Sequence, residues 1–166
     1  MIDTVDPTGK TFYLATGAPA NGVPCRIVAG ASAFVRDDQG RILLEKRSDN
    51  GFWDMPAGRM EVGESITNTV VRETLEETGL TVKVDRLIGV YSDPALFNLG
   101  RSNSGEVVQY VNCCFACTAV RGEVRMSEES TDIGFFPADA LPEPLLESHR
   151  LRIRDALSNQ LTAFVR

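Results

Sequence analysis

A run of acidic side chains is the part of this sequence with the clearest chemistry. Glu73, Glu76 and Glu77 lie within five residues of one another, and Glu64 precedes them. On a helix, at about 100° per residue, the first three occupy an arc of roughly 100°. Clustered carboxylates bind hard cations such as Mg²⁺, together with phosphate oxygens of a substrate. The pattern therefore indicates a metal site that acts on a phosphorylated compound.

A solvated acidic face is the alternative, and it is common among helices rich in glutamate. Local energetics disfavour it here, because Glu73 and Glu77 form an i,i+4 like-charge pair that costs roughly a few tenths of a kcal/mol. Arg72, four residues before Glu76, is the one obvious opposite charge within the helix that would reduce this repulsion. A divalent cation would relieve the repulsion far better.

The element that must position these carboxylates is a helix over about Ile66 to Thr78. The Ser65 hydroxyl is suited to cap its first turn, and Gly79 is suited to end it in a left-handed conformation. Val70 and Thr74 lie in the arc beside the glutamates, so one side of the helix can pack on a sheet.

The stretch from Gly58 to Leu80 resembles the Nudix box, G-x5-E-x7-R-E-x-x-E-E-x-G. The fixed positions are matched by Gly58, Glu64, Arg72, Glu73, Glu76, Glu77 and Gly79, with Leu80 at the apolar end. Thr74 departs from the pattern, since the family usually has an aliphatic residue there. Seven fixed positions would match by chance on the order of once in a million chains of this length.

The resemblance implies a fold as well as a reaction. The expected fold is α+β, an α/β/α sandwich with a mixed β-sheet, the Nudix loop-helix-loop and a C-terminal helix. It would form one domain over residues 1–166, with residues 1–24 as an N-terminal arm or strand. The implied activity is that of a Mg²⁺-dependent (or Mn²⁺-dependent) pyrophosphohydrolase. Its substrate would be a nucleoside diphosphate linked to another moiety, such as ADP-ribose, a nucleotide sugar or alcohol, or a nucleoside triphosphate.

The same resemblance implies roles for the residues of the box. Glu73, Glu76 and Glu77 would bind the metal, with a main-chain carbonyl of Ala57 or Gly58 as a further ligand. Arg72 would orient Glu73, while Glu64 would tie the loop down or support a second metal through water. Gly58 and Gly79 would allow a close approach or a positive φ.

The general base is left open by the sequence. Family members place it in the box, here Glu73, or on a distant loop. The loop candidates are Glu106 and the pair Glu128 and Glu129. A solvated surface charge is the alternative for each of these three.

Substrate contacts are expected from residues around the box. Arg47 and Arg59 flank it and could reach phosphates, and Phe52 and Trp53 could stack on a base. Tyr91, Phe97 and Tyr110 are further aromatic candidates, although aromatic residues in or beside strands more often belong to the core. His149, the single histidine, is expected at the surface of the last helix without a chemical role.

The remaining segments predict several strands and one more helix. Residues 25–47 are expected to form a hairpin around Asp37–Gly40, residues 81–93 and 106–120 two strands, and 132–137 a short one. A helix is expected from about Pro144 onward. Cys113, Cys114 and Cys117 lie in the longest strand, and their "CxxC" lacks a second pair of zinc ligands, so a buried strand is expected.

The composition limits which kinds of binding partner are expected. The net charge is −6 and no basic block stands out, which disfavours long nucleic acid. The apolar runs are too short to cross a bilayer and the start lacks a secretory signal, so a cytoplasmic location is expected. A small nucleotide is the expected partner, and the resemblance leaves a homodimer open, because Nudix proteins often pair.

Two alternatives to a hydrolase remain. A Nudix-fold module that senses a nucleotide without cleaving it usually lacks part of the box, whereas every acidic position is present here. An isomerase on the same fold would need a reactive cysteine and a cluster of metal-binding histidines, and the chain has one histidine.

Overall fold

The computed structural model describes residues 12–20, 24–102, 104–158 and 160–166. The arm expected over residues 1–24 therefore lies partly outside the described residues. Within it, residues 12–20 form a turn closed by a bridge between Tyr13 and Pro19, and residue 24 is also described. Phe12 packs there with Leu99 and Val107 in a small apolar cluster.

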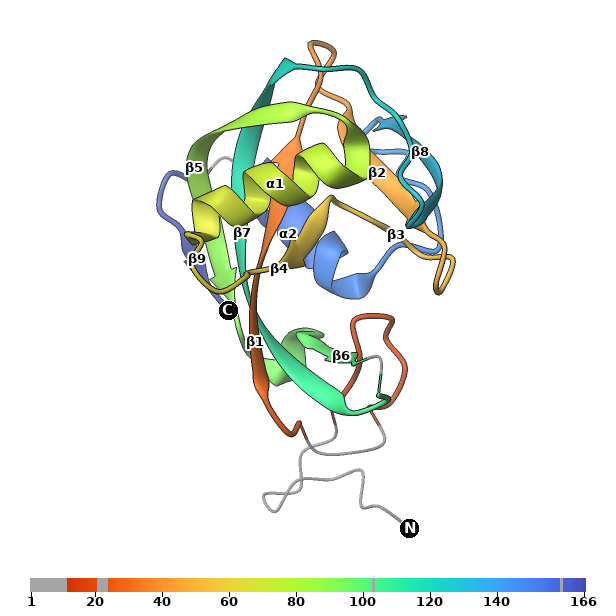
Figure 1. The fold of residues 1–166 in the computed structure, drawn as a ribbon, viewed down its shortest axis with the longest axis vertical. Helices are drawn as coiled ribbons and strands as arrows, with labels where there is room; N and C mark the ends of the chain where they lie inside the picture. Colours follow the sequence, from red (N-terminus) through yellow and green to blue (C-terminus); the bar gives the residue numbers. More distant parts are fainter. Residues whose placement is uncertain (1–11, 21–23, 103, 159) are drawn as a thin grey trace.

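Two sheets form the framework (Figure 1). The large mixed sheet has the order β4 (Ala57–Arg59), β1 (Ile27–Val35), β7 (Val107–Arg121), β5 (Thr81–Tyr91) and β9 (Phe164–Val165), with β6 (Leu99–Arg101) paired to β7. The small antiparallel sheet has the order β3 (Trp53–Asp54), β2 (Ile42–Arg47) and β8 (Ser130–Phe136). Because β1 runs parallel to β7 while β5 runs antiparallel to it, the large sheet is mixed, as expected.

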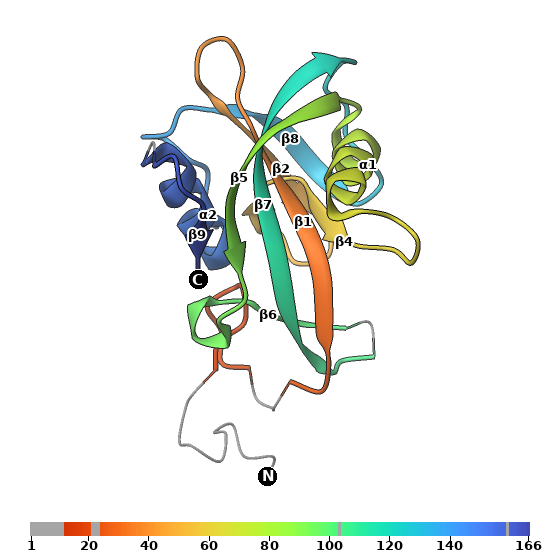
Figure 2. The ribbon, with the colours of Figure 1, turned by 90° about the vertical axis from the view of Figure 1, so that its left-hand side faces the viewer.

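The two helices, α1 (Ile66–Thr78) and α2 (Glu147–Leu157), lie on opposite sides of the large sheet (Figure 2). Successive side chains of a strand point to opposite faces. On β1, Ala31, Ala33 and Val35 accordingly pack in the cluster that includes Val70 of α1. Phe34 packs in the other cluster, which includes Ile153 of α2. The expected α+β fold with a mixed sheet and two helices is confirmed.

Helix α1 has the boundaries that the sequence predicts. The Ser65 hydroxyl accepts a hydrogen bond from the Asn68 N–H at 3.2 Å. Gly79 ends the helix with φ 76°, a left-handed conformation that favours glycine. These two residues set the two ends of the helix that carries the glutamates.

Three local predictions need correction. The strands β1 and β2 do not form a hairpin, because β1 pairs with β4 and β7 while β2 pairs with β3 and β8. Only a single bridge, Arg36 to Ile42, joins the two segments. The final helix begins at Glu147 and ends at Leu157, and Phe164–Val165 pairs with β5 as an edge strand. The expected loop after Asp93 contains a 3₁₀ turn, η1 (Pro94–Leu96), and strand β6.

The cysteines of β7 lie where a buried strand places them. Cys114 belongs to the cluster beside α2 and Cys117 to the cluster beside α1. Burial raises the pKa of the Cys114 thiol to about 11. Within the described ranges no helix is both long and apolar enough to traverse a bilayer.

Candidate functional site

Arg72 connects the loop before α1 to the helix itself. Its Nη2 donates to Glu64 Oε1 at 2.8 Å and to the Arg59 carbonyl at 3.0 Å. Its Nη1 donates to Glu73 Oε1 at 2.9 Å. One guanidinium therefore holds the loop against the helix and sets the direction of the Glu73 side chain.

Glu64 is occupied by bonds within the loop. Its carboxylate also accepts from the Glu61 N–H at 2.7 Å and from the Thr69 hydroxyl at 2.8 Å. The bond from Arg72 is the largest influence and, with the others, lowers the pKa of Glu64 to about 2. These bonds show that Glu64 holds the loop before α1 in place.

Strand β4 brings the main chain of residues 57–59 against two of the glutamates. A Cβ at position 58 would overlap the Glu73 carboxylate, so the close approach requires glycine. The Ala57 N–H donates to Glu77 Oε2 at 2.8 Å. The sequence argument that Gly58 permits a close approach is thus matched by its surroundings.

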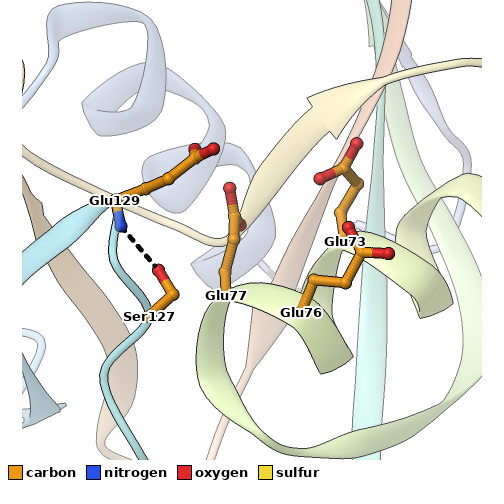
Figure 3. Close-up of a pocket in the computed structure, with 5 residues that line it drawn as sticks. All are labelled: Glu73, Glu76, Glu77, Ser127 and Glu129. Carbon is orange, nitrogen blue, oxygen red and sulfur yellow. Dashed lines mark hydrogen bonds between the residues drawn. The ribbon is translucent and has the colours of Figure 1, made fainter.

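Four carboxylates share one small cavity of about 160 Å³ (Figure 3). It is lined by Glu73, Glu76, Glu77, Ser127 and Glu129. Glu129 comes from the segment that leads into β8, where its N–H donates to the Ser127 hydroxyl at 3.2 Å. Within the part of the chain that the structure describes, no group of three or more Asp, Glu, His or Cys side chains is arranged to hold a metal ion as it stands.

The floor of this cavity is strongly acidic. Glu77 is 8% exposed and lies near two other buried carboxylates, Glu45 and Asp54. Burial, followed by repulsion from these two, raises the pKa of Glu77 to about 11. Asp54 Oδ1 is buried without a hydrogen-bond partner. These clustered carboxyl oxygens suit a hard divalent cation, which would displace the proton that the raised pKa leaves on Glu77.

A larger cleft of about 930 Å³ opens from the carboxylates. The sequence-predicted residues that line it are Arg47, Ala57, Gly58, Arg59, Glu73, Glu77 and Glu129. Arg47 is already paired, at 2.7 Å with Asp49 and at 3.4 Å with Asp54. Arg59 faces the cleft from the end of β4.

Other predicted residues lie elsewhere. Trp53 is buried in the core with its ring 5.0 Å from that of Phe136, and Phe52 lines neither cavity. Stacking of a base on Trp53 or Phe52 is therefore not supported, because Trp53 is enclosed by apolar side chains. Phe97 and Tyr110 are the aromatic residues that line the cleft.

Glu106 is separated from the carboxylates along β7. The register places Gly58 beside Ala31, and Ala31 beside Cys113. Glu106 precedes Cys113 by seven residues, about 23 Å of extended strand. Its exposed carboxylate accepts from the Ser104 hydroxyl at 2.9 Å in the turn before β7. Of the three loop candidates, Glu106, Glu128 and Glu129, only Glu129 lines the cavity with the box glutamates.

His149 corrects an expectation. The sequence places it at the surface, but it is 5% exposed, and its Nδ1 accepts the Met55 N–H at 2.9 Å. It shares the buried face of α2 with Arg152, Ile153 and Ala156, at spacings of three, four and seven residues. That helical periodicity was the signal in the sequence, because the same spacing marks a face turned to the core.

Comparison with known proteins agrees with this geometry. The family model described as the NUDIX domain matches residues 26–157. The chain is 35% identical over 146 residues to a MutT-like protein from Streptomyces ambofaciens, covering 88% of this chain and 86% of that one. It is 36% identical over 122 residues to an ADP-ribose pyrophosphatase from Methanocaldococcus jannaschii, covering 72% and 67%.

Solved structures give the same result for the fold. An ADP-ribose pyrophosphatase from Streptococcus suis superposes with a TM-score of 0.62 at 25% identity, covering 84% of this chain and 97% of that one. Together with the family match over residues 26–157, this leads to one conclusion: the chain belongs to the Nudix family and is a Nudix hydrolase.

Proposed function

We propose that this chain hydrolyses the pyrophosphate linkage of a nucleoside diphosphate joined to another moiety, with Mg²⁺ or Mn²⁺ as cofactor. The observation that carries the proposal is the meeting of Glu73, Glu76, Glu77 and Glu129 in one cavity that opens into the larger cleft. Relatives named as ADP-ribose pyrophosphatases support a substrate of the ADP-ribose class. Nucleotide sugars, nucleotide alcohols and nucleoside triphosphates are the alternatives within the same chemistry.

Glu73, Glu76 and Glu77, with a carbonyl of Ala57 or Gly58, are the proposed metal ligands. Divalent cations bound there would neutralise phosphate oxygens and lower the pKa of a bound water. The crowding of carboxyl groups around Glu77 supports this assignment, since a cation would offset the repulsion that Glu45 and Asp54 exert on the ionised form of Glu77. Glu76 is the most exposed of the three side chains and reaches the cavity from its rim.

The proposed roles of the other residues follow from their contacts. Arg72 orients Glu73 through the 2.9 Å bond, and Glu64 anchors Arg72 and the loop. Arg59 contacts a phosphate, because Arg47 is held by Asp49 and Asp54. The base that takes the proton of the attacking water is Glu129 or Glu73, both of which line the same cavity.

The test is a panel of nucleotides incubated with the full chain, with and without Mg²⁺ or Mn²⁺. It includes ADP-ribose, nucleotide sugars, CDP-alcohols and all nucleoside triphosphates. The expected result is metal-dependent release of a nucleoside monophosphate from one class. A ligand that raises the melting temperature but is never cleaved with either metal would overturn the proposal in favour of a nucleotide sensor.

A further inference from the structure

The cleft has a second polar wall, contributed by different elements from the acidic one. It consists of Asn112 on β7 and of His149 and Arg152 on α2, all of which line the same cleft as Glu73 and Glu77. The three side chains are 7%, 5% and 4% exposed. We call these three residues the donor wall, because the polar atoms that their contacts within the protein leave free are hydrogen-bond donors.

The acceptor atoms of two of these side chains are already used within the protein. Asn112 Oδ1 accepts the Ser32 hydroxyl at 2.8 Å, so the free part of its side chain is the amide N–H₂. His149 Nδ1 accepts the Met55 N–H at 2.9 Å. Burial holds the pKa of His149 well below its usual value, so the imidazole is neutral and carries its proton on Nε2.

Arg152 adds a positive charge that no carboxylate in the described residues pairs with. Its Nη2 donates to Asn98 Oδ1 at 3.1 Å, its guanidinium lies 5.3 Å from the centre of the Tyr91 ring, and its Nε is buried without a partner. Asp155, three residues further along α2, is instead paired with Arg166 and accepts the Tyr91 hydroxyl. Burial of an unpaired cation is unfavourable, so a ligand that supplies acceptors would stabilise this arrangement.

We propose that the donor wall selects substrates that present an acceptor-only group, oxygen or ring nitrogen without N–H, at this end of the cleft. This rests on the proposed function, in that the group belongs to the part of the nucleotide outside the cleaved linkage. Among the substrates proposed there, it favours a guanine or hypoxanthine counterpart of ADP-ribose, or a nucleotide with a further phosphate, over ADP-ribose itself. Two sources have this chemistry: the O6 and N7 edge of a 6-oxopurine base, and an additional phosphate. Adenine presents an N6 amino group beside N7, which would face donors and leave them unpaired.

The surroundings of the wall suit a base as well as a phosphate. Phe97 and Tyr110 line the same cleft and offer aromatic faces for stacking. Phe97 is the one non-glycine residue among those described with a positive φ, 62°. Such a conformation persists where the surrounding structure over-determines it, and these positions cluster at ligand sites.

The test measures binding without divalent metal, so that it does not depend on turnover. Dissociation constants of GMP, IMP, AMP and inorganic pyrophosphate are measured by calorimetry with the full chain. If the base is the source, GMP and IMP bind at least about tenfold more tightly than AMP, because one unpaired donor is left by adenine. If a phosphate is the source, pyrophosphate binds and the three nucleotides bind alike.

Two pairs of variants decide whether the donor wall is responsible. Arg152→Met keeps an unbranched apolar stem and removes the charge and the donors, and Arg154→Met is the matched control, exposed on the same helix. The favoured ligand should lose tenfold or more in affinity with Arg152→Met and keep its affinity with Arg154→Met. The melting temperature of free Arg152→Met should stay the same or rise, because an unpaired buried charge is removed.

For His149 the two amides separate its two nitrogens. Asn places an acceptor near the Nδ1 position and keeps the bond to Met55, whereas Gln places a donor near the Nε2 position. His149→Asn should weaken binding of the favoured ligand by about tenfold and His149→Gln by less, although Gln loses the bond to the main chain.

The proposal is overturned if Arg152→Met and His149→Asn both bind the favoured ligand as the parent does. It is also overturned if Arg152→Met lowers the melting temperature without changing any affinity. Failure of the nucleotide panel with these affinities intact would remove only the hydrolysis.

Discussion

The two walls of the cleft differ in how the chain builds them. Glu73, Glu76 and Glu77 occupy little more than one turn of α1, whereas the donor wall takes residues from β7 and α2 that are almost forty positions apart. The charges differ as well: the acidic side gathers carboxyl groups, whereas the Arg152 guanidinium on the other side pairs with no carboxylate of the described residues. A metal ion would compensate the carboxyl groups of the acidic wall, and acceptor atoms of a nucleotide would compensate the donors of the other wall.

The largest effect is expected from removing a charge on the acidic side. Glu77→Gln keeps the volume of the side chain and its bond from the Ala57 N–H but loses the charge that would hold a metal. Loss of several kcal/mol of transition-state stabilisation corresponds to about a thousandfold lower turnover. Steady-state rates at saturating Mg²⁺, with the melting temperature of the metal-free protein, measure both properties.

The stability of the Glu77→Gln variant is a second readout. Without metal, Glu77→Gln should be about as stable as the parent at pH 8, because a pKa of about 11 leaves the Glu77 carboxyl of the parent already protonated at that pH. Full turnover by Glu77→Gln would remove the assignment of this residue as a metal ligand.

The next effect separates the two loop glutamates. Glu129→Gln should lower kcat by a few hundredfold if Glu129 is the general base, since positioned proton transfer contributes about 10² to 10⁴. Glu106→Gln is the matched control, with the same chemical change about 23 Å along β7 from the level of Gly58. Equal losses in the two variants would contradict the placement argument, and an unchanged Glu129→Gln would leave Glu73 as the base.

A smaller loss is expected from one added methyl group. In Gly58→Ala the new Cβ would overlap the Glu73 carboxylate, which must move away from β4. Displacement of a reacting or ligand group by about 1 Å costs up to about 10²-fold, and the flexible end of Glu73 should limit the loss to about tenfold.

The control for that variant is Gly134→Ala in β8. There a Cβ would meet the Phe136 ring at 3.5 Å, an ordinary contact, and φ lies outside the left-handed region. Kinetics with a Mg²⁺ titration should show a higher metal requirement for Gly58→Ala and parental behaviour for Gly134→Ala. Parental metal binding in both would show that Glu73 need not lie against β4.

The acidic side could be predicted from sequence because its information is local. The spacing of the glutamates, the Ser65 cap and the Gly79 end all lie within one stretch, and helix geometry converts that spacing into a shared face. The boundaries of α1 were correct for the same reason. The role of Glu129 was open, because its approach to α1 depends on how β8 joins the small sheet.

The donor wall could not be predicted, because it depends on how distant elements pack. No pattern in the sequence states that Asn112 of β7 and Arg152 of α2 face one cleft. Trp53 was misplaced for a related reason: its position before the box suggested the site, but pairing of β3 with β2 turns its ring towards Phe136. The separation of β1 and β2 into different sheets was also a tertiary outcome, since their turn signal fits a hairpin equally well.

The smallest effect tests whether His149, one of the three donor-wall residues, is neutral in the folded chain. Burial, then the charges of Arg152 and Arg47, depress the pKa of His149 well below 6.5 in the folded chain. Below pH 6.5 the unfolded chain therefore binds a proton that the folded chain does not. Stability that is present above pH 6.5 is lost as the pH falls, by about 1.4 kcal/mol between pH 7.5 and pH 5.5.

His149→Asn isolates this contribution, because it keeps the acceptor for the Met55 N–H and does not titrate. The buried carboxylates titrate in both proteins, so their effect cancels in the difference. Urea unfolding of parent and variant at the two pH values should show the parent losing about 1.4 kcal/mol relative to His149→Asn. A difference that does not change with pH would mean that His149 is protonated in the folded chain. Its Nδ1 could then not accept the Met55 N–H, and the donor wall would carry a second positive charge beside that of Arg152.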